Sequence, residues 1–187
     1  MKKQYERTAL TRSTIINTFL ELSRYKSADK ITVSEISHKA GYNRSTFYQY
    51  FDDTHHLISC IEDDLMNYIK DTIVSRICKA NPEQFFIDVF IKVYEEKRDI
   101  LKLLFRGTDN SFPAKLKEFL IPLFAQQLQM PQNEEQTVYK LDFYLSGIIA
   151  VISRWISSET PMSPPKYALL IQQIVEGMRK SELFNIL

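Results

Sequence analysis

The chain has 187 residues, 44% of them hydrophobic, which is enough for a small domain joined to a larger one with a sizeable core. Only 4 glycines and 7 prolines are present, and this scarcity of turn residues argues against a β-rich or disordered chain. The net charge is only +1, but residues 1–50 hold nine basic and four acidic residues, whereas the remainder holds 15 basic and 19 acidic ones. A basic N-terminal part on an acidic body is typical of a protein in which only one part meets phosphate groups.

The first predicted helix covers about residues 8–25, where Ile15, Phe19 and Leu22 recur at helical spacing and form one apolar face. A polar link over residues 26–30 follows this helix. Residues 31–51 then carry the most specific pattern in the chain. Thr32 and Glu35 form the T-x-x-E capping box, which predicts a helix that begins directly after Thr32.

A tight turn and a second short helix are predicted next. Gly41 stands where the preceding helix must end, in a left-handed position that suits glycine best. The Asn43 side chain is expected to cap a second helix that begins at Arg44, with Phe47 and Phe51 facing inward. This helix-turn-helix layout over residues 32–51 is typical of proteins whose second helix enters the DNA major groove. A pair of short amphipathic helices in an unrelated all-α core is the alternative interpretation.

Residues 31–51 read I-T-V-x-E-I-x-x-x-A-G-Y-x-x-x-T-F-Y-x-Y-F, and over roughly residues 8–58 the chain resembles the DNA-binding domain of TetR/AcrR-type transcriptional regulators. The outward side chains suit this role, since arginine can contact guanine or phosphate and glutamine can read adenine. Such domains usually carry a lysine that meets a phosphate where this chain has Thr54, followed by His55 and His56. These three groups either replace part of that contact or leave it weak. The residues expected to contact DNA are Thr32, Tyr42, Asn43, Arg44, Ser45, Thr46, Tyr48, Gln49, Tyr50 and Thr54.

The pattern predicts a DNA-binding domain over residues 1–52 and a helical regulatory and dimerisation domain over residues 53–187, with about nine helices in an all-α fold. A helix capped by residues 52–54 and running to about residue 79 links the two domains and carries Cys60 and Cys78. The two thiols are about 27 Å apart along this helix, which excludes a disulfide within the chain. His56 and Cys60 have a metal-type spacing, but two ligands are too few, so neither a metal site nor a cofactor is predicted.

Further helices are predicted at about residues 82–94, 98–105, 114–129, 134–157 and 167–183, with Pro122 kinking the third of these. Their aromatic residues recur at helical spacing, which is first of all a packing pattern. The same residues are also candidates to line an apolar ligand pocket. These candidates are Phe86, Phe90, Tyr94, Phe105, Phe119, Phe143 and Tyr144.

The segment at residues 134–157 is apolar on almost every side, so it must be covered on more than one face. A second copy of the chain is expected to cover one face and form a four-helix interface about a two-fold axis. A wholly intrachain core is the alternative. Residues 143–156 also resemble the C-terminal domain of a TetR-like branch that includes dihydroxyacetone kinase regulators. The expected interface residues are Leu145, Ile148, Ile149, Ile152, Trp155, Leu170, Ile174 and Met178.

The family resemblance implies a bacterial repressor that binds an inverted-repeat operator in double-stranded DNA as a homodimer and is released by a small-molecule effector. An activator of the same fold, or a regulator controlled by a protein partner, is the alternative. An enzyme is not predicted, because the three histidines offer no supported catalytic arrangement and no glycine-rich phosphate loop is present. The N-terminus lacks an apolar signal segment, and no apolar run approaches the roughly 20 residues of a membrane span. A cytoplasmic protein without membrane contact is therefore expected.

Overall fold

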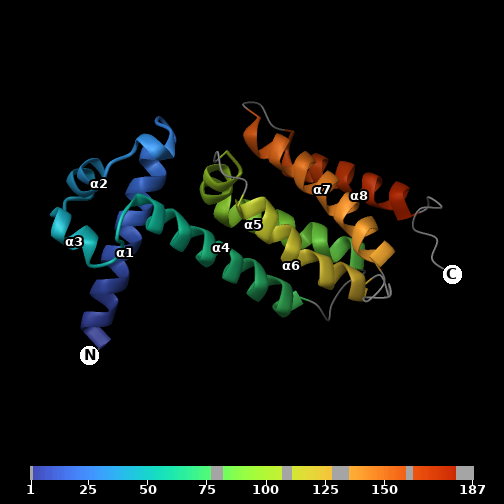
Figure 1. The fold of residues 1–187 in the computed structure, drawn as a ribbon, viewed down its shortest axis with the longest axis horizontal. Helices are drawn as coiled ribbons and strands as arrows, with labels where there is room; N and C mark the ends of the chain where they lie inside the picture. The colour runs from blue at the N-terminus through green and yellow to red at the C-terminus, as the bar shows by residue number, and fades with distance from the viewer. Residues whose placement is uncertain (1, 77–81, 107–110, 128–134, 159–161, 180–187) are drawn as a thin grey trace. The chain divides into compact units, whose positions relative to one another are not determined.

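The computed structural model describes residues 2–76, 82–106, 111–127, 135–158 and 162–179. These residues form eight α-helices and one short 3-10 helix, and no strand occurs among them, which confirms the all-α prediction (Figure 1). None of the described helices is both long enough and apolar enough to span a membrane. The elements in order are α1 (Lys2–Ser23), η1 (Ala28–Lys30), α2 (Val33–Ala40), α3 (Arg44–Tyr48), α4 (Thr54–Arg76), α5 (Pro82–Arg106), α6 (Ser111–Gln127), α7 (Glu135–Ser157) and α8 (Pro164–Arg179).

The chain divides into two compact units, Met1–Leu65 and Met66–Leu187, and the boundary falls within α4. The first unit contains α1, α2, α3 and the first part of α4. Its core is built from the apolar residues at helical spacing that the sequence places inward. These are Ile15 and Phe19 from α1, Ile36 from α2, Phe47 from α3, and Phe51, Leu57 and Ile61 from the segment that follows.

Three ion pairs fasten the surface of this first unit. Arg12 of α1 lies 2.8 Å from the Asp64 carboxylate of α4, and its guanidinium also lies 5.7 Å from the centre of the Phe51 ring. Lys26 pairs with Glu35 at 2.7 Å, and Lys39 pairs with Glu21 at 3.2 Å. Each pair joins segments that are separated in the sequence, so α1 is tied to both α2 and α4.

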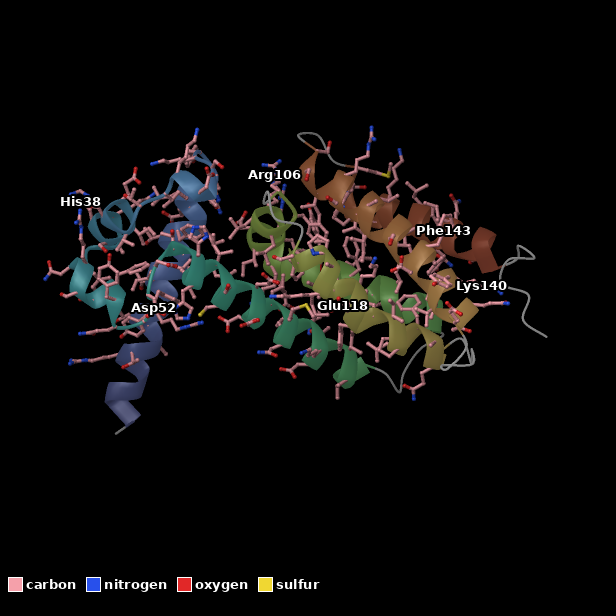
Figure 2. All side chains as sticks on the ribbon, in the orientation of Figure 1. His38, Asp52, Arg106, Glu118, Lys140 and Phe143 are labelled. Atoms are coloured by element: carbon pink, nitrogen blue, oxygen red, sulfur yellow. The ribbon has the colours of Figure 1, made fainter. Side chains whose placement is uncertain are left out.

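The second unit is a bundle in which α6 packs against α7, and α5 packs against α6, α7 and α8 (Figure 1). Between α6 and α7 lies a core of Phe124, Ala125, Leu141, Tyr144 and Leu145, of which Leu141 is fully buried. Arg106, labelled in Figure 2, donates from its guanidinium to the Ser157 carbonyl oxygen at 3.1 Å. It thereby satisfies an unpaired carbonyl at the C-terminal end of α7.

The segments at residues 82–94 and 98–105, expected as two helices, are two helical stretches that meet at a kink within α5. The kink lies at Lys97, whose backbone is non-helical at φ −127° and ψ 23°, and Lys97 Nζ lies 4.7 Å from the centre of the Tyr68 ring. Pro122 lies inside α6, as expected. The expected ends near residues 79 and 183, and Cys78, fall outside the described residues.

Candidate nucleic-acid interface

The start of α2 is held by the capping box that the sequence predicts. The Glu35 backbone N–H donates to Thr32 Oγ1 at 3.3 Å, and the Thr32 backbone N–H donates to Glu35 Oε2 at 2.9 Å. The Lys26 ammonium also donates to both oxygens of this carboxylate, at 2.7 and 2.9 Å. The Lys26 hydrogen bonds, followed by those from Thr32, lower the pKa of Glu35 to about 2. The Thr32 hydroxyl, an expected DNA contact, is therefore engaged in the cap.

Gly41 ends α2 in the left-handed conformation, with φ 74° and ψ 25°. The following backbone N–H, that of Tyr42, donates to the Ser37 carbonyl oxygen at 2.9 Å, which closes the turn. A Cβ at position 41 would meet nothing within 4 Å. Glycine is therefore required here by backbone conformation and not by lack of space.

Helix α3 begins at Arg44 as expected, but the capping of its first turn differs from the prediction. Asn43 occupies the N-cap position with extended backbone, and its side chain makes no capping hydrogen bond. The Asn43 carbonyl oxygen instead accepts from the backbone N–H groups of Thr46 and Phe47, at 3.0 and 3.4 Å. The Asn43 side chain is exposed and is not needed to hold the helix.

One face of α3 is anchored and the opposite face is bare. Phe47 is fully buried and Phe51 is 1% exposed, with their ring centres 5.6 Å apart. On the other side Tyr48 is 55% exposed. Arg44, Ser45 and Gln49 are also exposed, whereas Tyr42, Thr46, Tyr50 and Thr54 are half-buried. The expected DNA contacts of the turn and of α3 are thus all exposed or half-buried.

This surface carries little free positive charge. Of the nine basic residues in positions 1–50, Arg12, Lys26 and Lys39 are already paired with carboxylates of the same unit. Arg44 is the one basic residue of α3, and it forms no ion pair with any residue in the described ranges. The remaining groups on this surface are hydroxyls and amides. They can donate hydrogen bonds to phosphate oxygens, but they carry no charge and therefore displace no counterions from the DNA.

The N-terminus of α4 is capped within residues 52–54, as expected. Asp53 is the capping residue, because its Oδ1 accepts from the His56 backbone N–H at 2.7 Å, and this hydrogen bond lowers the pKa of Asp53. The His56 Nδ1 accepts from the Asp52 backbone N–H at 3.0 Å. The His56 ring is therefore engaged at the start of α4, whereas His55 is exposed and Thr54 is half-buried. No cluster of metal-type ligands occurs among the described residues.

Most of the aromatic residues expected to line a pocket pack against other side chains within the part of the chain that the structure describes. Phe90 and Tyr94 stack on other rings, Phe105 packs against Phe112 at 5.4 Å, and Tyr144 packs against Phe124 at 6.0 Å. Phe119 is half-buried beneath Lys70, and the Phe86 side chain lies outside what the structure describes. Phe143 is 70% exposed on α7 and cannot line an interior pocket (Figure 2). A described hollow is open and polar, lined by Asp88, Ile91, Lys92, Glu95 and Glu96 of α5.

The expected dimer surface also needs correction. Leu145, Ile149 and Trp155 are at most 7% exposed, because α7 packs on both α5 and α6 within one chain. Ile148, Ile152 and Ile174 are half-buried, Leu170 is 36% exposed, and nothing is described of the Met178 side chain. The exposed apolar side chains of α7 and α8 are Val138, Tyr139, Phe143, Leu169 and Leu170.

The sequence does contain a signal for this other face of α7. Tyr139, Phe143, Gly147 and Ala150 recur at steps of four, four and three, and all four are exposed. A Cβ at Gly147 would meet nothing within 4 Å, so the helix surface is open at this point. The sequence pattern alone does not single out this stripe, because the opposite stripe of α7 contains more and larger aliphatic residues.

Comparison with known proteins gives one family match and one curated relative. A model of the TetR C-terminal region, described as "Transcriptional regulator C-terminal region", matches residues 80–177, which is more than half of the chain. The "Uncharacterized HTH-type transcriptional regulator YvdT" of Bacillus subtilis (strain 168) is 30% identical over 97 residues, covering 50% of each protein. The chain therefore aligns with about half the length of this curated relative.

Solved structures show the same fold at low sequence identity. A putative TetR-family transcriptional regulator from Syntrophomonas wolfei has a TM-score of 0.75 and 14% identity, covering 95% of this chain and 99% of that one. The transcriptional regulator FadR from Bacillus subtilis, in complex with stearoyl-CoA, has a TM-score of 0.68 and 14% identity, covering 87% and 96%. At these identities the similarity shows the fold alone.

Proposed function

Since this chain belongs to the TetR family of transcriptional regulators, we propose that it is a sequence-specific DNA-binding regulator whose operator is read by α3. The family consists of transcriptional regulators and not of enzymes. The observation that carries the proposal is the asymmetry of α3, which buries Phe47 and leaves Arg44, Ser45, Tyr48 and Gln49 accessible on its other side. A short helix with one anchored and one bare polar face is suited to the major groove.

Each group in the proposed contact set has a distinct role. Arg44 supplies the charge of α3 and contacts either a phosphate or the acceptor edge of guanine, while Gln49 pairs with the edge of adenine. The remaining contacts are hydrogen bonds from hydroxyl and amide groups to phosphate oxygens. They position the helix on the DNA, and they do not distinguish one base sequence from another. They come from Tyr42, Asn43, Ser45, Thr46, Tyr48, Tyr50 and Thr54. Thr32, also expected as a contact, has both its hydroxyl and its backbone N–H engaged with Glu35.

We assign dimerisation to the exposed stripe of α7 and the exposed side of α8, which replace the buried residues expected from the sequence. The apolar face consists of Tyr139, Phe143, Leu169 and Leu170. Gly147 and Gly177 have no neighbour within 4 Å of a Cβ position, so two helices can approach closely at both points. Four such helices about a two-fold axis would bury this face in a homodimer.

Selection of bound duplexes from a random DNA pool tests DNA reading and symmetry together. The expected result is an inverted repeat whose half-site centres lie about 34–36 Å apart, because a two-fold dimer places two α3 helices in successive major grooves. Recovery of an asymmetric single site would contradict the symmetric dimer. Recovery of no preferred sequence, with binding governed only by salt concentration, would contradict sequence-specific reading.

Control by a small molecule bound in the second unit completes the proposal for a cytoplasmic repressor. The Bacillus subtilis FadR structure, which has the same fold, is a complex with stearoyl-CoA, and this supports control of the present chain by a small molecule. Because α4 continues from the first unit into the second, a shift of α4 on effector binding would reach the DNA-reading helices. Such coupling is typically worth about 1–3 kcal/mol. The alternative is an activator, or a regulator controlled by a protein partner. Transcription measured with purified components distinguishes these alternatives from a repressor controlled by a small molecule.

A further inference from the structure

Four aromatic rings from three helices meet inside the second unit. Phe90 and Tyr94 come from α5, Trp155 from α7 and Tyr167 from α8. Trp155 is central, with ring centres 4.2 Å from Tyr94, 4.3 Å from Tyr167 and 5.9 Å from Phe90. The rings of Trp155 and Tyr167 are nearly parallel, at 12°. We call these four residues the aromatic cluster.

The Tyr167 hydroxyl is the unsatisfied polar group of this cluster. Tyr167 is 2% exposed, and its Oη has no hydrogen-bond partner among the residues that the structure describes. Burial raises the pKa of this phenol, so the hydroxyl retains its proton and can donate. Trp155 differs, because its Nε1 donates to the Met162 carbonyl oxygen at 2.8 Å. A phenylalanine at position 167 would fill the same place without burying an unpaired hydroxyl, which costs free energy.

We propose that the aromatic cluster is the effector site of this regulator and that it takes a flat, uncharged aromatic molecule whose hydrogen-bond acceptor receives the Tyr167 hydroxyl. This inference rests on the proposed function, because it names the ligand class of an effector-controlled regulator. The rings of Trp155 and Tyr167 are in contact, with their centres 4.3 Å apart, so a flat molecule would bind by separating them and would then stack on both.

The charge and polarity of the ligand follow from the surroundings of the cluster. All four members are uncharged, so an ionised ligand would lose its hydration without a charged partner among them. The guanidinium of exposed Arg98 lies 5.9 Å from the centre of the Tyr94 ring, at the edge of the cluster. A positive charge near the cluster favours a ligand that carries an electron-rich hydrogen-bond acceptor, such as a carbonyl oxygen, over a ligand that carries a hydrogen-bond donor. Tyr167 then supplies the donor that orients this acceptor.

The position of the cluster also indicates how such a ligand would act. Trp155 belongs to α7 and Tyr167 to α8, and these same helices carry the exposed apolar face assigned to the dimer. A ring inserted between Trp155 and Tyr167 would move the two helices apart. The ligand would therefore change the shape of the dimer face and, through it, the separation of the two DNA-reading helices.

The test uses the full chain and two bicyclic probes of similar size: coumarin, which carries a carbonyl acceptor, and naphthalene, which carries none. Affinity is measured by equilibrium dialysis. Because Trp155 is the single tryptophan of the chain, its fluorescence lifetime reports whether the probe reaches the cluster. Tyr167→Phe removes only the hydroxyl, and Tyr25→Phe is the matched control, since Tyr25 is 88% exposed in the first unit.

The expected result is that the wild-type protein binds coumarin about tenfold or more tightly than naphthalene and that coumarin shortens the Trp155 lifetime. Tyr167→Phe should lose this preference and leave naphthalene binding unchanged, while Tyr25→Phe should behave as the wild type. Equal coumarin affinity in Tyr167→Phe and wild-type protein would overturn the proposal, as would an unchanged lifetime at saturating coumarin. So would a lower melting temperature of Tyr167→Phe, because it would show that the hydroxyl is already satisfied.

Failure of this inference is distinguishable from failure of the proposed function. The same wild-type preparation is tested for selection of a duplex from random DNA. A protein that selects an inverted repeat but does not bind coumarin at Trp155 retains the proposed function and loses this effector site. A protein that selects no duplex loses the proposed function, whatever it binds at the aromatic cluster.

Discussion

Replacement of Phe143 by alanine tests whether the exposed face of α7, and not its buried face, forms the dimer interface. Phe143 is 70% exposed in one chain, whereas Leu145, two residues later, is 1% exposed. Full burial of a phenylalanine side chain is worth about 1.5–3 kcal/mol, so covering this exposed fraction in a partner would contribute about 1–2 kcal/mol per protomer. A two-fold interface uses the residue twice, and Phe143→Ala should weaken dimerisation by about 2–4 kcal/mol, or about 30- to 1,000-fold in Kd.

The matched variant Leu145→Ala has the opposite signature. Leu145 packs with Leu141 and Phe124 between α6 and α7, so its truncation should destabilise folding by about 2–5 kcal/mol through loss of buried contacts and a cavity. Sedimentation equilibrium measures the dimer Kd, and urea unfolding measures the stability of each variant. A dimer left intact by Phe143→Ala but dissociated by Leu145→Ala, with folding unaffected, would refute the assignment of the exposed stripe to the interface.

Two further predictions concern α2 and its turn. Glu35 has a folded-state pKa of about 2, below its ordinary value, so the stabilisation from Lys26 and Thr32 is present above about pH 4.5 and is lost as the pH falls towards 2. Glu35→Gln should therefore lower the melting temperature at pH 7 and have little effect near pH 2; an equal effect at both pH values would contradict this origin. Gly41→Ala forces a Cβ into the left-handed region and should destabilise the first unit by about 1–2 kcal/mol in urea unfolding monitored by circular dichroism. Because no atom lies within 4 Å of that Cβ, a larger loss would indicate a steric cause that the structure does not show.

The features predicted well are those determined by short-range interactions. The capping box joins Thr32 to Glu35 across three residues, and the left-handed Gly41 follows directly from the end of α2. Phe47 and Phe51 are four residues apart, so their common burial follows from helical spacing and from the absence of another apolar face on α3. In each case the residue type and its nearest neighbours are sufficient to determine the conformation.

The features predicted poorly depend on residues far away in the sequence. Helix α7 is apolar on several faces, and the choice between Leu145 and Phe143 as the buried residue depends on how α5 and α6 pack against it. The same holds for Trp155, whose neighbours Tyr94 and Tyr167 belong to α5 and α8.

Operator affinity of Arg44→Ala tests the central claim, that the bare face of α3 lies against DNA, more directly than any other measurement. Fluorescence anisotropy with the selected duplex should show that Arg44→Ala binds more weakly by about 1–3 kcal/mol per half-site. The slope of log K against log salt concentration should become smaller in magnitude by about one per half-site, and the dimer should be unchanged. Lys30→Ala is the control, because Lys30 is an exposed basic residue of the same unit outside the proposed contact set. Unchanged affinity and salt dependence in Arg44→Ala, or an equal loss in both variants, would contradict the assignment of α3 as the reading helix.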